Sequence, residues 1–348
     1  MNHKLIVMII ISAILMGAYF LYFNNKANDV SPIHHGTVMP LINKAPTYPS
    51  TQTIKIATNV NTDTVNPLDS VDSAASHAEK TPYESNWCTE SDLSEEDSQY
   101  AQTQTAEWNE SRGYIFLREE GDDVSSNKYS HLLDTYKAMT LEHLLELAMQ
   151  DDEWAMSAAL QSTDLRVTPQ IKDKLANRLI ILNKSPFGLT RLFSGKVFDI
   201  EREFKKTKQI TPKLKQDMKD AMKYLSYSVS RYDVTVLNVY GVATDQIEGF
   251  KTVLNPRNVL TDEDFEEVKQ SVHQFVKQID EQREKENLPP INQIDIPKIA
   301  HHEFESSLAH LYFMYGDIFN DIEPANLETG PQIKPSACVK RYVAALKG

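Results

Sequence analysis

The stretch DAMKYLSYSVSRYDVTVLNVYG, residues 220–241, gives the clearest indication of the fold. Its apolar and small residues recur at the three- and four-residue spacing of a helix face on both sides of Tyr232-Asp233. Asp is a residue type that caps helices, so a second helix is expected to start after Asp233. The first helix is expected to begin at Thr211-Pro212, where Thr caps and Pro takes the first helical position. The stretch therefore predicts two helices joined by a tight turn.

A second stretch, TLEHLLELAMQDDEWAMSAAL at residues 140–160, repeats this arrangement with Asp151-Asp152 at the turn. Leu144, Leu147 and Ala148 make one helix face before that turn, and small alanines follow it.

A weaker copy lies between the two. Thr168-Pro169 is expected to start one helix, and Ser185-Pro186 a short second helix through Leu189 and Leu192, with the turn placed at Gly188. The spacing of the three turns lies near the repeat lengths of about 34 to 47 residues in helical solenoids.

This pattern resembles the Sel-one-like repeats, a family related to tetratricopeptide repeats. The family unit opens with Ala, places an aromatic residue three positions on, turns at Gly-Asp or Gly-Asn, then carries a small Ala and closes on Leu-Gly. The matching residues are Ala221, Tyr224, Asp233 and Gly241 in one copy, and Ala148, Asp152 and Ala155 in the other. The departures are Tyr232 and Asp151 in place of the turn Gly, and Val236 in place of the small Ala. The match covers roughly a third of the chain, and an ordinary helical domain with two look-alike hairpins is the alternative.

The resemblance implies a stack of hairpins with an extended concave surface that binds another protein. Aromatic residues anchor such interfaces, so a candidate protein-binding groove is formed by Tyr224, Tyr227, Tyr232 and Tyr240. The alternative is that these tyrosines are packing residues within the hairpins.

The chain has 348 residues and a formal net charge of −13. Residues 84–123 hold twelve Asp or Glu against two Arg, so one segment carries most of the imbalance. Nucleic acid is not expected as a partner, because its phosphates need a basic surface.

Residues 5–23, LIVMIIISAILMGAYFLYF, contain no charge and are long enough to cross a bilayer as a helix. A cleaved signal peptide needs small residues at two positions before the cut, and Gly17-Ala18 lies inside the apolar run beside Met16. An uncleaved signal-anchor is therefore expected. The chain is interpreted as a single-pass protein of a bacterial inner membrane with its bulk in the periplasm.

The expected organisation follows from composition. Residues 1–4 form a cytoplasmic stub, 24–82 a flexible tether, 83–139 an acidic N-terminal cap segment, 140–243 the helical repeat region, and 244–348 the C-terminal helices. The aromatic residues of the cap segment are expected to pack on the first hairpin. The fold class is all-α, with short α-solenoid-like hairpin repeats and amphipathic C-terminal helices on one transmembrane helix.

The C-terminal helices have clear local signals. Thr261 and Asp264 have the spacing of a capping pair, and the helix after them is expected to end before Leu288-Pro289-Pro290. A further amphipathic helix is expected to carry Phe304 through Phe319, and a final helix to run through Cys338, Tyr342 and Leu346.

No catalytic, cofactor-binding or metal-binding residues are assigned. His301-His302-Glu303, with Glu305 and His310, lacks the spacing of a zinc protease helix. Ser125 and Lys128 have the spacing of penicillin-binding enzymes but no partner motifs, and Ser194-Gly195-Lys196 fails as a phosphate loop.

Cys88 and Cys338 are the two cysteines of the chain, and an oxidising compartment allows them to form a disulfide. Two separate buried thiols are the alternative. The expected function is a membrane-anchored periplasmic scaffold or adaptor that binds another envelope protein and has no enzymatic activity. A cell-wall enzyme with an unrecognised site, or a purely structural tether, remains the alternative.

Overall fold

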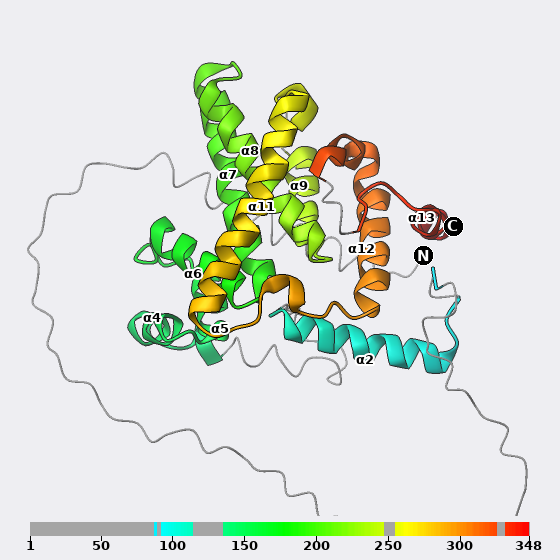
Figure 1. The fold of residues 1–348 in the computed structure, drawn as a ribbon, viewed down its shortest axis with the longest axis horizontal. Helices are drawn as coiled ribbons and strands as arrows, with labels where there is room; N and C mark the ends of the chain where they lie inside the picture. Colours follow the sequence, from blue (N-terminus) through cyan, green and yellow to red (C-terminus); the bar gives the residue numbers. More distant parts are fainter. Residues whose placement is uncertain (1–86, 89–91, 114–134, 247–254, 326–330, 348) are drawn as a thin grey trace, which may run out of the picture. The chain divides into compact units, whose positions relative to one another are not determined.

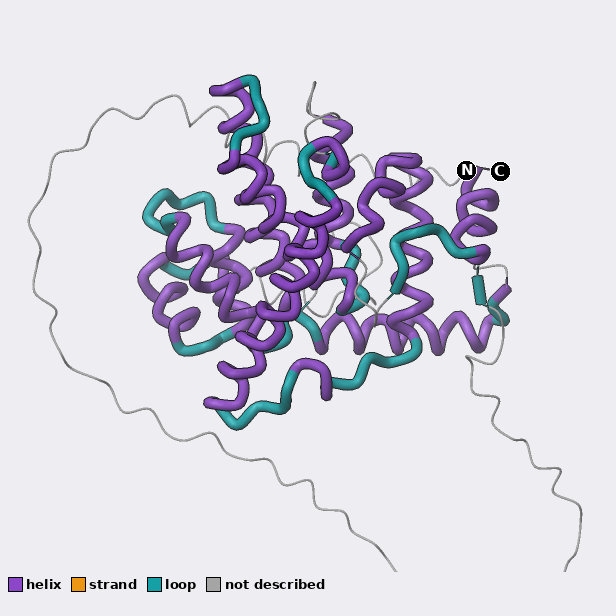
Figure 2. The backbone as a smooth tube through the Cα atoms, turned by 45° about the horizontal axis from the view of Figure 1, so that its top comes forward, coloured by secondary structure: helices purple, strands orange, loops and turns teal. Residues whose placement is uncertain are grey.

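Every regular element that the computed structural model describes is a helix, and no strand occurs in those residues, which are 87–88, 92–113, 135–246, 255–325 and 331–347. Figure 2 shows this part of the chain as helices and connecting loops. The predicted all-α class is confirmed. The elements are α2 (Glu95–Ser111), α4 (Leu141–Met149), α5 (Glu153–Gln161), α6 (Pro169–Ile181), α7 (Ser185–Thr207), α8 (Pro212–Ser230), α9 (Thr235–Gln246), η4 (Pro256–Asn258), α11 (Asp262–Lys285), η5 (Ile291–Gln293), α12 (Ile299–Tyr315), η6 (Gly316–Ala325) and α13 (Ala337–Lys347).

The two predicted hairpins, α4–α5 and α8–α9, turn in the same way. Asp151 and Tyr232 are left-handed, with φ of 66° and 56°. The next backbone N–H, of Asp152 and of Asp233, donates to a carbonyl five residues back, at 3.2 and 3.0 Å. The same two Asp side chains then accept from the first turn of the following helix. Each turn therefore ends one helix and caps the next.

The middle hairpin turns at Asn183, so the predicted turn at Gly188 is wrong. Asn183 has a φ of 61°, and the N–H of Lys184 donates to the carbonyl of Leu179 at 2.8 Å. Gly188 instead lies inside α7, where a Cβ would stand 2.5 Å from the carbonyl oxygen of Ala176. Glycine there allows α6 and α7 to approach closely. The helix predicted to be short, α7, has 23 residues.

Successive helices from α4 to α9 pack on one another, and α7 also contacts both α5 and α9. Helix α11 lies along α8 and also contacts α6, so it covers part of the hairpin region from another side (Figure 1). The capping pair predicted at its start is present: Thr261 and Asp264 form a reciprocal capping box.

The C-terminal helices hold the N-terminal one. Helix α13 packs on α12, and α12 contacts α2, α9 and η6. Trp87 and Trp108 form a buried cluster with Ile299 and Ala300 of α12. The prediction that the aromatic residues of the acidic segment pack on the first hairpin is therefore wrong for these two tryptophans. Phe319, predicted in the same helix as Phe304, lies in η6, because α12 ends at Tyr315.

Several predictions concern residues outside the described part of the chain. These are the transmembrane anchor at 5–23, the tether at 24–82, and residues 114–134 of the acidic segment. Among the described helices, none combines the length and the apolar character that crossing a bilayer requires.

Candidate functional site

The tyrosines of α8 lie under α11. The rings of Tyr224 and Tyr227 meet the ring of Phe275 edge-on, with centroids 5.8 and 5.2 Å apart. Tyr227 is fully buried and Tyr224 half-buried. Both rings therefore contribute to the surface on which α11 is seated.

The other two predicted groove tyrosines contact later elements. The ring of Tyr232 lies 4.9 Å from that of His301, at the start of α12. The ring of Tyr240 is buried and lies 6.2 Å from that of Phe319 in η6. All four tyrosines thus pack against the chain's own C-terminal elements, on three different helices or turns.

Ion pairs add to the apolar contacts between α11 and the hairpin region near both ends of α11. Near its start, Lys215 and Lys219 of α8 pair with Asp264 and Glu267, each at 2.6 Å. Near its end, Arg178 of α6 donates to Glu286 at 2.8 Å. The helix is thereby held in one register along the hairpin region, by an apolar stripe between two sets of charges.

A buried polar group lies in the middle of this contact. The hydroxyl of Tyr227 and the Nη2 of Arg231 have no hydrogen-bond partner among the described residues. Burial raises the pKa of Tyr227 to about 12 and lowers that of Arg231. Asp280 and Arg283 of α11 are their charged neighbours. The interface between α8 and α11 therefore contains polar atoms whose desolvation is not compensated.

A second buried charge cluster joins α2 to the α8–α9 turn and to α12. The guanidinium of Arg112 lies 3.7 Å from the carboxylate of Asp233, and both side chains are buried. It also donates to Asn109 at 2.6 Å and to the Tyr232 carbonyl at 3.4 Å. Burial raises the pKa of Glu303, and Arg112 partly opposes that rise. Sequence reasoning missed this cluster, because its members are far apart in the chain and Asp233 was assigned only a capping role at the hairpin turn.

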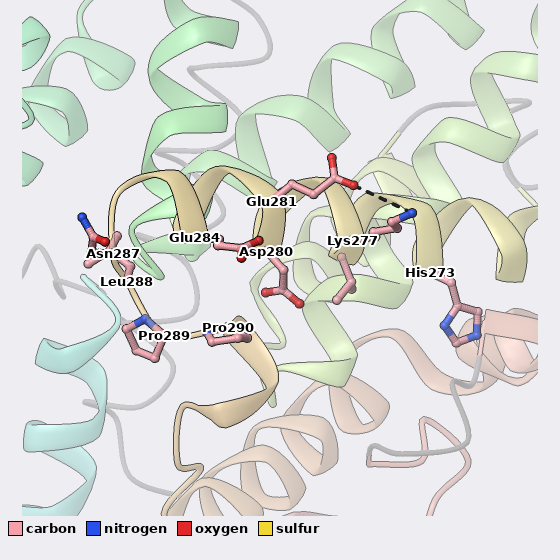
Figure 3. A pocket seen from close by; sticks show the side chains of 10 residues that line it. His273, Lys277, Asp280, Glu281, Glu284, Asn287, Leu288, Pro289 and Pro290 are labelled. Carbon is pink, nitrogen blue, oxygen red and sulfur yellow. Dashed lines mark ion pairs between the residues drawn. The ribbon is translucent and has the colours of Figure 1, made fainter.

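An open cleft of about 770 Å³ runs beside the second half of α11 (Figure 3). Apolar groups come from Val276 and from the turn after the helix. The Asp280 side chain points from α11 toward the segment after this turn, whereas Glu281 pairs with Lys277 at 3.8 Å. Asp280 also accepts the N–H of Ile291 at 2.6 Å. The lining residues are His273, Val276, Lys277, Asp280, Glu281, Glu284, Asn287, Leu288, Pro289 and Pro290.

The His-rich start of α12 serves packing contacts. His301 meets Tyr232, His302 lies edge-on to Trp87 with ring centroids 5.9 Å apart, and the Nδ1 of His310 is 2.8 Å from the Ser306 carbonyl. Across the described ranges, no three His, Cys, Asp or Glu side chains are grouped so as to hold a metal ion.

Of the two motifs rejected on sequence grounds, the phosphate-loop motif lies in the described part of the chain and the Ser125–Lys128 motif does not. Lys196, from the rejected phosphate-loop motif, pairs with Asp217 and Asp220 at 3.0 and 2.8 Å. Ser125 and Lys128 lie outside the described residues.

The predicted disulfide between Cys88 and Cys338 is present, with 5.1 Å between the two Cα atoms. It joins the segment before α2 to the start of α13, next to the ion pair between Asp92 and Arg341.

Comparison with known proteins adds no relative: no protein-family model, curated protein or solved structure matches this chain.

Proposed function

We propose that this chain is a scaffold or adaptor that binds another protein of the cell envelope, with residues 5–23 as its membrane anchor and its folded part in the periplasm. Residues 140–243 are proposed to be degenerate hairpin repeats of the solenoid type. The disulfide supports the compartment, because such bonds persist where the surroundings are oxidising. The shared turn of α4–α5 and α8–α9 supports the repeat interpretation.

The observation that carries the proposal is the packing of α11 along α8 and α6. An amphipathic helix laid along other helices, with an apolar stripe between charged ends, is a recurring mode of protein recognition. Here α6 and α8 hold such a helix within one chain. Helical-hairpin surfaces of this kind are suited to contacts with other helices, and α4 keeps an exposed face that carries Glu142, Glu146 and Met149.

The proposal is tested by site-specific photo-crosslinking of the full chain in membranes of its native host. Leu165 is 71% exposed and Met149 47% exposed, so a crosslinker at either position reaches solvent from the first hairpin region. We expect one protein adduct that excess unlabelled chain competes away. A crosslinker at Val272, on the buried face of α11, is the matched control and is expected to give no adduct with another protein. Absence of any competed adduct from both exposed positions would refute protein binding through this region.

The anchor is tested separately by mass spectrometry of the mature protein. An uncleaved anchor predicts that residues 5–23 remain attached, because Gly17-Ala18 is a poor cleavage site. A mature N-terminus beyond Tyr19 would contradict the anchor and leave the protein-binding proposal standing.

A further inference from the structure

The connection between α7 and α8 is the most basic part of an acidic chain. Residues 202–215 carry six Lys or Arg and one Glu, whereas the whole chain has a net charge of −13. This segment, here called the basic tip, spans the end of α7, the turn and the start of α8, at the top of Figure 1. The basic tip therefore differs in charge from the protein that carries it.

The turn within the basic tip has a fixed backbone. Lys208 ends α7 in the left-handed conformation, with a φ of 56°, and its N–H donates to the carbonyl of Phe204 at 2.8 Å. The hydroxyl of Thr207 donates to the carbonyl of Glu203 and accepts the N–H of Gln209 at 3.3 Å. Thr211 then caps α8. These bonds hold the side chains around Lys208 in a defined arrangement.

Two cations and one apolar side chain of this turn face solvent. Lys206 and Lys208 are exposed and form no ion pair among the described residues. Ile210, between them and α8, is 51% exposed. In contrast, Lys205 and Lys213 pair within their own helices at 2.5 Å. The turn thus presents an apolar group beside two free positive charges.

Carboxylates around the basic tip have other partners: Glu203 accepts a hydrogen bond from the hydroxyl of Thr211 at 3.0 Å. Asp264, at the start of α11, pairs with Lys215, which lies in the first turn of α8. Glu267 pairs with Lys219. The charges of Lys206 and Lys208 are therefore available to a partner.

We propose that the basic tip docks on an anionic lipid surface, with Ile210 entering the headgroup region and Lys206 and Lys208 beside it. Basic residues near an anionic membrane each strengthen binding, by about fivefold per lysine, and an apolar side chain adds burial. The rest of the chain is acidic and is repelled by such a surface, so the docked orientation is specific. This inference rests on the proposed anchor, which holds the basic tip near a bilayer and makes a weak contact effective.

The experiment uses the full chain in vesicles of phosphatidylcholine alone or mixed equally with phosphatidylglycerol. Gln209→Cys is labelled with an environment-sensitive fluorophore under non-reducing conditions, which leave the Cys88–Cys338 bond intact. On the anionic vesicles we expect a blue-shifted emission and slower quenching by aqueous iodide, both reversed by high salt. The same label at Gln293, an exposed position in η5, is expected to respond equally in both vesicles.

Charge variants test whether Lys206 and Lys208 cause the difference in fluorescence between the two vesicles. Lys206→Glu with Lys208→Glu is expected to abolish the difference between the two vesicles, whereas the charge-matched control Lys277→Glu with Lys285→Glu on α11 keeps it. Ile210→Ser is expected to reduce the blue shift while the salt dependence remains, which separates the apolar contribution from the electrostatic one.

The outcomes separate the inference from the function it rests on. If the labelled chain floats with both vesicles but the Gln209 signal is the same in each, lipid docking is refuted and the anchor stands. If the chain does not float with vesicles, the proposed anchor fails. A response to soluble polyglutamate that anionic vesicles do not reproduce would overturn lipid docking in favour of an acidic protein partner.

Discussion

The Cys88–Cys338 bond is expected to account for a large share of the stability of the folded region. It joins residues 250 positions apart. In the chain-entropy model a loop of that length restricts the unfolded chain by roughly 5 kcal/mol, and measured losses on removing native disulfides run from about 2 to 5 kcal/mol. For a domain of this size each kcal/mol shifts the melting temperature by about 2–4 °C. Opening the bond at a cost of about 3–5 kcal/mol therefore predicts a fall of about 6–20 °C.

The assay is thermal unfolding by circular dichroism, with and without reductant, of the native chain and of Cys88→Ser with Cys338→Ser. Reductant is expected to lower the melting temperature of the native chain to that of the double variant, and to leave the double variant unchanged. Thiol titration of the unfolded chain confirms the redox state. If the native chain melts within about 2 °C of the oxidised form although both thiols are shown to be reduced, the bond does not supply the expected stabilisation.

Three further substitutions test the buried polar contacts. Tyr227→Phe removes a hydroxyl with no hydrogen-bond partner among the described residues, so denaturant unfolding is expected to show equal stability or a gain of about 1 kcal/mol; a clear loss would reveal a missed partner. Asp264→Asn breaks the α11 capping box and is expected to cost about 1 kcal/mol at pH 7. Burial alone would raise the pKa of Asp264, but the ion pair with Lys215 and hydrogen bonds from Thr261 lower it to about 2. The stabilisation is therefore present above the unfolded value of 3.8 and lost as the pH falls toward 2, so unfolding curves of variant and native chain should converge there. Arg112→Met leaves the buried carboxylate of Asp233 without its cation and is expected to cost about 3 kcal/mol in the same assay, partly restored by Asp233→Asn; equal stability of native chain and variant would contradict an electrostatic role.

Local signals allowed the helix starts to be predicted. Thr168, Thr211 and Thr261 cap the helices whose starts they predict, and each bond spans only three residues. Asp152 and Asp233 likewise mark the two hairpin turns, because an Asp side chain reaches the N–H groups directly after it.

Gly188 was misleading because glycine has two structural uses. A glycine in a sequence often indicates a turn. Here its missing side chain instead lets α7 pack closely against the Ala176 carbonyl. The actual turn uses Asn183, which also adopts the left-handed conformation readily. The choice between the two residues depends on the distance between α6 and α7, which the sequence does not contain.

The surroundings of the four tyrosines were beyond sequence reasoning for a similar reason. The periodicity of α8 predicted that Tyr224 and Tyr227 share the apolar side of a helix, but Phe275 is about 50 positions away and reaches them only after α11 is seated. Their role as a protein-binding groove stays a prediction. The buried Arg112 cluster combines residues of three separate helices and turns, and the local signal of Asp233 predicts a helix cap rather than a distant cation.

The covalent link has a consequence for the order in which the protein matures. Ribosomes deliver the chain from its N-terminus, so the hairpins from α4 to α9, whose contacts are mostly between successive helices, are able to assemble first. Helix α11 arrives later to cover α8, and α13 last. Cys88 is among the earliest described residues to emerge, yet its bonding partner lies in α13, the last of the described helices along the chain. Oxidation of this pair thus reports that synthesis has reached α13, and it closes the fold only after every other described helix is available to pack.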